Sequence, residues 1–140
     1  MSIKRKYAEA LMDMTERFSE TSEAERLKVC ALIYKNDSII SLGVNGQPPG
    51  WPTERCEDEK NQTLPTVRHA ESAALEKLYL SHETSEGATM FVNYAPCIGC
   101  AIKIKTAKIK EVYYRHTYRD SSGLSYLQES GVTVTRLKEK

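Results

Sequence analysis

Two short motifs constrain this chain more than any other feature: H-A-E at residues 69–71 and P-C-I-G-C at residues 96–100. Between them they hold one imidazole, two thiols and one carboxylate. Imidazole nitrogen and thiolate sulfur are typical zinc ligands, and three protein ligands leave one coordination position free for water, as in catalytic sites. We therefore take His69, Cys97 and Cys100 as candidate metal ligands and Glu71 as a candidate group for proton transfer.

The spacing of the two cysteines favours a shared metal. In a helix, Cys97 and Cys100 would lie on one face, with about 5–6 Å between their Cβ atoms. The start of a helix also lowers the pKa of a thiol, and Pro96 suits that position because its missing N–H costs nothing there. A C-x-x-C pair alone also fits a redox pair or half of a structural zinc site, so a non-catalytic, zinc-stabilised interaction module stays open.

A chain of 140 residues, 40% hydrophobic and 28% charged, is expected to form one globular domain over residues 1–140. Lys and Arg number 20 against 19 Asp and Glu, a balance that disfavours nucleic acid as a partner. No apolar run approaches the roughly 20 residues of a membrane helix, and residues 1–7 lack the apolar stretch of a signal peptide. The cysteine usage fits a reducing compartment, so we expect a cytoplasmic protein, in the host cytoplasm if the gene is viral.

The pattern of apolar residues, turns and breaks predicts an α/β chain. Helices are expected over residues 3–18, 69–80, 97–108 and 121–129, and strands over 29–34, 39–44, 88–94, 110–114 and 132–136. Gly131 is a suitable stop for the last helix. Residues 45–67 form a long irregular segment rich in Gly, Pro and charge, and loops of this length inside compact domains are usually functional or disordered.

Helices alternate with strands after residue 69, which implies right-handed crossovers and parallel neighbouring strands. The helices before and after strand 88–94 both run opposite to that strand, so both helices begin at the same edge of the sheet. Their first residues carry His69 and Cys97. Because open α/β sheets bind ligands at the carboxyl ends of their strands, this edge is the expected site.

On these two motifs the chain resembles the zinc-dependent cytidine/deoxycytidylate deaminase superfamily. The resemblance implies a three-layer fold, in which a mixed five-stranded sheet carries helices on both faces. It also implies Zn²⁺ as the cofactor, held by the imidazole and both thiols, in a hydrolase that replaces the amino group at C4 of a pyrimidine. Glu71 is then the catalytic residue that carries protons to N3 of the ring and to the departing ammonia.

A second motif, G-V-N-G-Q-P-P-G at residues 43–50, is similar to a turn of deoxycytidylate deaminases, although such a turn alone is a common loop. The resemblance implies that Asn45 contacts the sugar and that Ala70 belongs to the substrate site. It also implies that the turn helps to bind a regulatory nucleotide, accompanied by Mg²⁺, because its glycines let the backbone approach phosphate closely. The candidate regulatory residues are Asn45, Gly46, Gly50, Arg26 and Lys28.

A monophosphate substrate needs a cation, and residues 115–120 follow a strand that ends at the expected site. Arg115 or Arg119 could supply bidentate hydrogen bonds, and Tyr118 could pack on the nucleotide or bond to it. A solvated turn is the alternative. The helix at 121–129 implies that the last strand is parallel to its neighbour. Deoxycytidylate and tRNA deaminases share that arrangement, whereas small free-cytidine deaminases have an antiparallel last strand.

These features favour a dCMP deaminase, which converts dCMP to dUMP and ammonia and so supplies dUMP for thymidylate synthesis. Relatives of that kind are commonly homohexamers, activated by dCTP and inhibited by dTTP with magnesium, and we expect the same here. A deaminase of tRNA or another polynucleotide is the enzymatic alternative. Two stretches depart from the family: residues 51–67, and Ser72-Ala73 where Met-Asn often follows H-A-E.

The remaining cysteines and histidines are interpreted as structural. Cys30 lies in an apolar strand and is expected in the core, whereas Cys56 lies in a charged loop without a C-x-x-C partner. His82 and His116 lack a set of partner ligands, and we do not expect them to bind metal.

Overall fold

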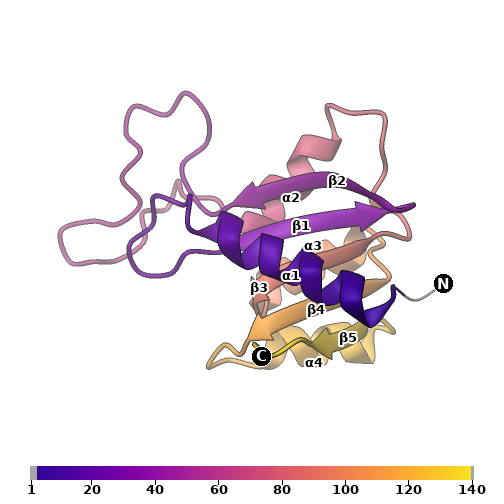
Figure 1. Ribbon diagram of the computed structural model, residues 1–140. Coiled ribbons are helices and arrows are strands. Elements are labelled where there is room, and N and C mark those ends of the chain that lie inside the picture. The colour runs from indigo at the N-terminus through magenta and orange to yellow at the C-terminus, as the bar shows by residue number, and fades with distance from the viewer. Residues whose placement is uncertain (1–2, 140) are drawn as a thin grey trace.

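The computed structural model describes residues 3–139 and contains every helix and strand that the sequence predicts (Figure 1). The helices are α1 (Arg5–Ser19), α2 (Ala70–Leu78), α3 (Ile98–Thr106) and α4 (Ser122–Glu129). The strands are β1 (Cys30–Lys35), β2 (Ser38–Val44), β3 (Thr89–Tyr94), β4 (Glu111–His116) and β5 (Thr133–Arg136). Among residues 3–139, no helix is both long and apolar enough to span a membrane.

The strands form one five-stranded sheet in the order β2-β1-β3-β4-β5. The β1 strand pairs antiparallel with β2 and β3, whereas β3, β4 and β5 run parallel. Asn36 and Asp37 form the turn between β1 and β2 with positive φ angles of 50° and 62°, which these two residue types tolerate. The mixed sheet and the parallel last strand are both confirmed.

Helices cover both faces of the sheet, because successive side chains of each strand point to opposite faces. On one face, Met12 of α1 packs with Leu32 and Phe91, and the Phe91 ring stacks on Tyr113 with 4.9 Å between ring centroids. The core on the other face joins the sheet to α2, α3 and α4 and includes Ala74, Met90, Ile104, Val112 and Leu127. Figure 1 shows α1 in front of the sheet and the other helices behind it. The predicted three-layer arrangement is confirmed.

The order α2-β3-α3 determines where the two motifs lie. Both helices run back along β3, so each begins at the edge of the sheet where β3 ends, at Tyr94. The neighbouring strand ends at the same level, because Tyr94 pairs with His116 of β4. The first residues of α2 and α3 therefore meet at the carboxyl ends of two parallel strands.

The segment between β2 and α2 projects beyond that same end of the sheet, at the left of Figure 1. The segment contains no helix or strand. Two isolated antiparallel β-bridges within it nevertheless join Gly46 to Arg68 and Glu57 to Thr63. The long irregular segment expected from the sequence thus has a defined path beside the predicted site.

One close approach near the site requires glycine. Gly123, in the first turn of α4, is buried. A Cβ atom placed there would lie 2.1 Å from the carbonyl oxygen of Pro96 and 2.9 Å from two backbone atoms of Cys97. The α4 helix therefore packs directly on the backbone that presents the first thiol.

We expect Gly123→Ala to destabilise the fold by about 2–3 kcal/mol, because the added methyl group must displace backbone rather than a flexible side chain. Urea denaturation measures this loss. The metal content of the variant should fall as well, since the displaced backbone carries Cys97. Ser125→Ala, at an exposed position of the same helix, is the control and should change stability by less than about 0.5 kcal/mol. Equal stability of the two variants would contradict the close packing.

Candidate active site

Three candidate metal ligands come together where α2 and α3 begin. His69 is the N-cap residue of α2 and Cys97 that of α3, and Cys100 lies in the first turn of α3. The Nδ1 atom of His69 lies 3.7 Å from Sγ of Cys97 and 3.2 Å from Sγ of Cys100, and the three donor atoms all lie within 4.8 Å of one another. Tetrahedral zinc with bonds of about 2.0–2.3 Å holds its ligand atoms about 3.3–3.8 Å apart. The donor set therefore fits zinc.

Hydrogen bonds link these three side chains, and a metal cation can replace the protons in those bonds. Hydrogen bonds from Cys100 and then from His69 lower the pKa of the Cys97 thiol to about 3. The bond to Cys97, together with burial, raises the pKa of Cys100, and the bond between His69 and Cys97 raises the pKa of His69. Thiolates and a neutral imidazole are the forms that bind metal, so zinc binding here would release protons.

Glu71 lies in the first turn of α2, next to the metal donors but outside their set. The residue is only 4% exposed, and burial raises the pKa of its carboxyl group. A carboxyl group whose pKa is moved toward neutral pH can both accept and release a proton during a reaction. Its position and its pKa both suit proton transfer.

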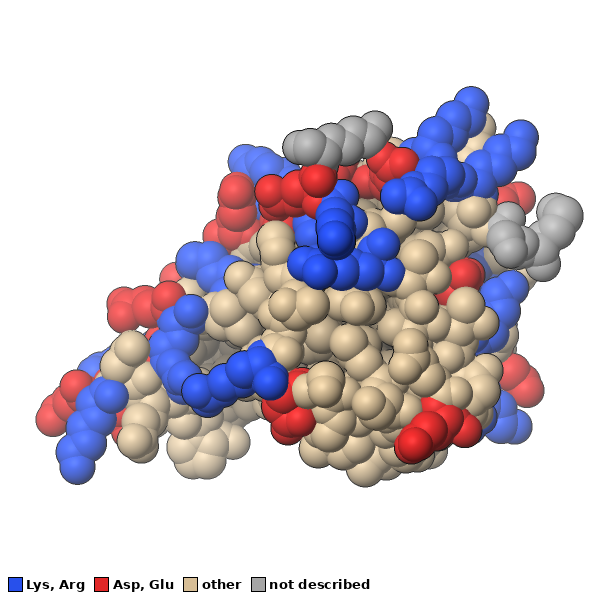
Figure 2. Space-filling model, turned by 90° about the horizontal axis from the view of Figure 1, so that it is seen from below, with Lys and Arg blue, Asp and Glu red and all other residues tan. Residues whose placement is uncertain are grey.

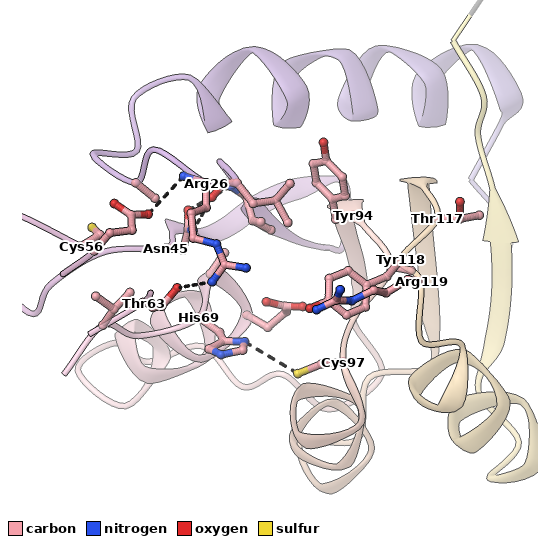
Figure 3. Close-up of a pocket in the computed structure, with 18 residues that line it drawn as sticks. Arg26, Asn45, Cys56, Thr63, His69, Tyr94, Cys97, Thr117, Tyr118 and Arg119 are labelled. Carbon is pink, nitrogen blue, oxygen red and sulfur yellow. Dashed lines mark hydrogen bonds between the residues drawn. The ribbon is translucent and has the colours of Figure 1, made fainter. Parts of the chain in front are cut away.

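His69, Cys97 and Glu71 line a cavity of about 510 Å³ (Figure 3). Its walls come from the segment before β1, the loop after β2, the start of α2, the end of β3 and the segment after β4. Figure 3 shows Tyr94 on the opposite side of this space from His69 and Cys97. A cavity of this size is typical of small-molecule sites.

Three of the four residues predicted to contact the substrate line this cavity, and so does Arg119, the second arginine considered for the phosphate. The three are Asn45, Ala70 and Tyr118. Ala70 is fully buried, whereas Tyr118 and Arg119 come from the segment after β4. Part of the Asn45 amide is used within the fold, because its oxygen accepts a hydrogen bond of 2.9 Å from the backbone N–H of Val29.

Arg115, the fourth predicted contact, does not line the cavity. Its guanidinium group donates to the carboxylate of Asp13 at 2.8 Å and to the carbonyl of Leu137 at 3.1 Å. The reason is that β4 continues to His116, past the predicted end at residue 114. Arg115 is therefore still a strand residue, pointing to the α1 face like Tyr113. Of the two arginines considered for the phosphate, Arg119 therefore lines the cavity and Arg115 does not.

The residues predicted for a regulatory nucleotide lie in two neighbouring segments, one before β1 and one after β2, which hydrogen bonds of Asn45 join. Arg26 and Asn45 line the cavity that Glu71 lines. Lys28 donates a hydrogen bond to a backbone carbonyl, and Gly46 exchanges backbone hydrogen bonds across the loop. Gly50 has a positive φ of 83°, as a tight turn requires.

Several residues of the cavity wall were not predicted from the sequence. They include Cys56, Glu57, Thr63, Val67 and Tyr94. The position of Tyr94 at the carboxyl end of a strand could have indicated its role. The loop residues carry no comparable signal: Cys56 lies in a charged stretch of sequence yet is only 1% exposed. His116, expected to lack partner ligands, in fact lies with Glu16 and Glu139 in a second group of possible donors, separate from the His-Cys-Cys set.

A family pattern described as cytidine and deoxycytidylate deaminase zinc-binding region matches residues 5–116, which include both motifs. The chain belongs to the cytidine and deoxycytidylate deaminase family. The predicted fold class and the prediction of a hydrolase that deaminates its substrate are thereby confirmed. The family binds zinc, in agreement with the His-Cys-Cys donor set.

Within this family the chain is similar to a solved dCMP deaminase from the cyanophage S-TIM5, in complex with dCMP and dUMP. The two are 41% identical with a TM-score of 0.94, over 97% of this chain and 100% of that chain. The deoxycytidylate deaminase of Mycobacterium phage D29 is 31% identical over 109 residues, which are 69% of this chain and 84% of the phage protein. That of Saccharomyces cerevisiae is 29% identical over 134 residues, 88% of this chain but 42% of the yeast protein, so the chain spans less than half of its length.

Metal removal should expose one reactive thiol. In folded, chelator-treated protein at about pH 7 we expect iodoacetamide to alkylate Cys97, because its pKa of about 3 keeps it a thiolate. Cys30 should stay unmodified, because it is fully buried and burial raises its pKa to about 12. Mass spectrometry of the digested protein measures the alkylation of Cys97 and of Cys30. Zinc added before the reagent should protect Cys97, and equal labelling with and without zinc would contradict its role as a ligand.

Proposed function

We propose that this chain catalyses the hydrolytic deamination of dCMP to dUMP and ammonia with a bound Zn²⁺. The observation that carries the proposal is the likeness, over 97% of the chain, to the cyanophage dCMP deaminase solved with dCMP and dUMP. A His-Cys-Cys donor set beside a buried carboxyl group, in one cavity, supplies the groups that this reaction requires.

The residues at the metal end of the cavity divide the chemistry between them. His69, Cys97 and Cys100 would hold a zinc ion, which would supply a water molecule of lowered pKa as the nucleophile. Glu71 would take one proton of that water and give it to N3 of the ring as the oxygen adds to C4. It would then take the second proton of that oxygen and pass it to the amino group, so that the C4–N bond breaks, ammonia leaves and a carbonyl oxygen remains at C4. The burial of Glu71 keeps bulk water away from that proton.

The rest of the cavity offers groups for the sugar and the phosphate. Arg119 supplies a cation for the monophosphate, and Tyr118 beside it packs on the nucleotide or bonds to it. Asn45 contacts the sugar through an amide hydrogen: its Nδ2 atom carries two, and one is donated to the carbonyl of Leu27 at 2.7 Å. Ala70 forms the wall between the metal ligand and the acid.

We extend the proposal to properties that rest on the resemblance to deoxycytidylate deaminases. These are activation by dCTP, inhibition by dTTP with Mg²⁺, a homohexamer, a cytoplasmic location and the supply of dUMP for thymidylate synthesis. The turn at residues 43–50 is the proposed part of the regulatory site, because open space adjoins Gly50, where the backbone can approach phosphate.

A deaminase of tRNA or another polynucleotide has less support. Binding a polynucleotide depends on a basic face that neutralises several phosphates. On the side seen in Figure 2, Lys and Arg are interspersed with Asp and Glu around a broad uncharged area, and the formal net charge is +1. A non-catalytic zinc module would have no use for a buried carboxyl group in a cavity beside the metal.

Glu71→Gln should lower kcat by about 10²–10⁴-fold, because glutamine keeps the shape of the side chain but cannot carry the proton. Zinc content, measured by metal analysis, should stay the same, because the carboxyl group is not a ligand. Ammonia release measures turnover. Glu76→Gln is the control: Glu76 lies on the same helix and pairs with Arg68, 2.7 Å away, at the surface. Lost zinc with retained turnover in Glu71→Gln would reverse the assigned roles.

The substrate is tested by ammonia release from dCMP, CMP, deoxycytidine and a short RNA, each with and without dCTP or dTTP. We expect dCMP to have the highest kcat/KM, because the cavity offers a cation to its phosphate. We also expect dCTP to raise the rate and dTTP with Mg²⁺ to lower it. Deoxycytidine turned over as efficiently as dCMP would defeat the nucleotide assignment, and preferred turnover of RNA would favour the polynucleotide alternative.

A further inference from the structure

A second group of possible metal donors lies beside α1, outside the cavity. It consists of Glu16 near the end of α1, His116 at the end of β4 and Glu139 in the segment after β5. The ligand atoms that these side chains offer all lie within 4.8 Å of one another. None of the three residues lines the cavity that Glu71 lines. The group is therefore separate from the candidate active site.

The distances within the group suit a small divalent cation. Nε2 of His116 lies 2.5 Å from Oε1 of Glu16 and 3.8 Å from Oε1 of Glu139. Zinc with bonds of about 2.0–2.2 Å to nitrogen and oxygen holds tetrahedral ligand atoms about 3.3–3.6 Å apart, a separation between these two distances. A cation would replace the proton between His116 and Glu16 and move their atoms apart, while Glu139 would move closer. The last torsion of a glutamate side chain is broad enough for this adjustment.

Negative charge is in excess in this group. Two carboxylates meet one imidazole, so at least one negative charge is uncompensated even when the imidazole is protonated. Among the ion pairs of residues 3–139, His116 is the one partner of Glu16 and of Glu139. Arg115, the residue before His116, pairs instead with Asp13 at 2.8 Å. Like charges this close repel one another, and a divalent cation between them would remove the repulsion.

Asn93 fixes the orientation of the Glu16 carboxylate. The Asn93 side chain is fully buried, and its Nδ2 atom donates to Oε2 of Glu16 and to the carbonyl of Lys28, both at 3.0 Å. Its oxygen accepts from the N–H of Cys30 at 2.9 Å. Because Oε2 is held in this way, Oε1 is the oxygen that faces His116. Carboxylates that bind metals are typically oriented by such hydrogen bonds from an outer partner.

His116 is also held in place by its neighbours, whereas Glu139 is not. The His116 ring lies against Tyr94, with 4.9 Å between ring centroids, and its backbone carbonyl accepts from the N–H of Ala95 at 2.9 Å. The side chain of Glu139 is 63% exposed, two residues after Leu137, whose N–H donates to β4. Two donors are therefore preorganised, and the third belongs to an exposed side chain that can close on a cation.

We propose that Glu16, His116 and Glu139 form a second metal site, which binds a divalent cation of the zinc class with water as the remaining ligand. An imidazole among carboxylates suits Zn²⁺ better than Mg²⁺, which prefers an octahedral shell of oxygens and keeps much of its water. The cation joins α1, the end of β4 and the segment after β5, so its role is to stabilise the fold. The inference is independent of the proposed deaminase activity.

Zinc stoichiometry of the full chain tests the proposal. Protein stripped by a chelator is titrated with Zn²⁺ in competition with a coloured zinc indicator. We expect two zinc ions per chain, the tighter one at the His-Cys-Cys set. His116→Gln should weaken binding of the second ion at least about 10- to 100-fold, the loss caused by removing even an outer partner of a metal ligand. Binding of the first ion should not change.

Glu139→Gln should weaken the second ion in the same direction, by about tenfold or more. The matched controls are His82→Gln and Glu129→Gln, which make the same changes at exposed positions elsewhere and should bind both ions as the wild type does. Zinc beyond the first equivalent should also raise the Tm of the wild type, by about 5–10 °C at a free concentration a hundredfold above the dissociation constant. It should not raise the Tm of His116→Gln.

Three results would overturn the proposal. The first is a single zinc ion per chain in the wild type. The second is a second ion whose affinity is the same in His116→Gln, Glu139→Gln and the wild type, because that ion must lie elsewhere. The third is displacement of the second zinc by an equal concentration of Mg²⁺, which would indicate attraction to carboxylates without an imidazole ligand. Urea denaturation shows whether each variant is folded, and the exposed Glu139 position decides the question if His116→Gln is unstable.

Discussion

The parallel pairing of β3 with β4 is the constraint on which the site depends. Because α2 precedes β3 and α3 follows it, both helices must begin at the edge where β3 ends. The two N-cap positions there hold an imidazole and a thiol. Each N-cap carbonyl accepts the first hydrogen bond of its helix, from Ala73 to His69 at 3.0 Å and from Ala101 to Cys97 at 2.9 Å. The ligands are therefore held by regular backbone geometry.

This geometry explains why the metal donors could be predicted from the sequence. Motifs that start helices are local, and the alternation of helices with strands determines which starts share an edge. Arg115 shows the limit of the method. The end of a strand is hard to place within two residues, and alternate strand residues face opposite sides of the sheet. Because β4 runs to His116, Arg115 keeps the strand's alternation and faces α1, and the next arginine along the chain, Arg119, is the one that lines the cavity.

The loop between β2 and α2 could not be predicted for a different physical reason. Its structure depends on contacts between residues far apart in sequence, such as the carboxylate of Glu57 with the N–H of Arg26. Neither residue belongs to a periodic pattern, and a charged stretch of sequence gave no sign that Cys56 and Glu57 would be buried. In this fold the metal donors and Glu71 lie at the starts of helices, whereas much of the cavity wall lies on loops, which vary more freely.

The wall of the cavity combines acidic and basic side chains. Glu57, Glu71 and Cys97 line the same cavity as Arg26 and Arg119. Burial raises the pKa of Glu71, so its carboxyl group carries less negative charge than an exposed one, whereas hydrogen bonds from Cys100 and His69 lower the pKa of Cys97. In a partly buried site electrostatic forces act at lower dielectric than in water and are correspondingly stronger. The charge that a bound group meets in this cavity therefore depends on the protonation of Glu71 as well as on the two arginines.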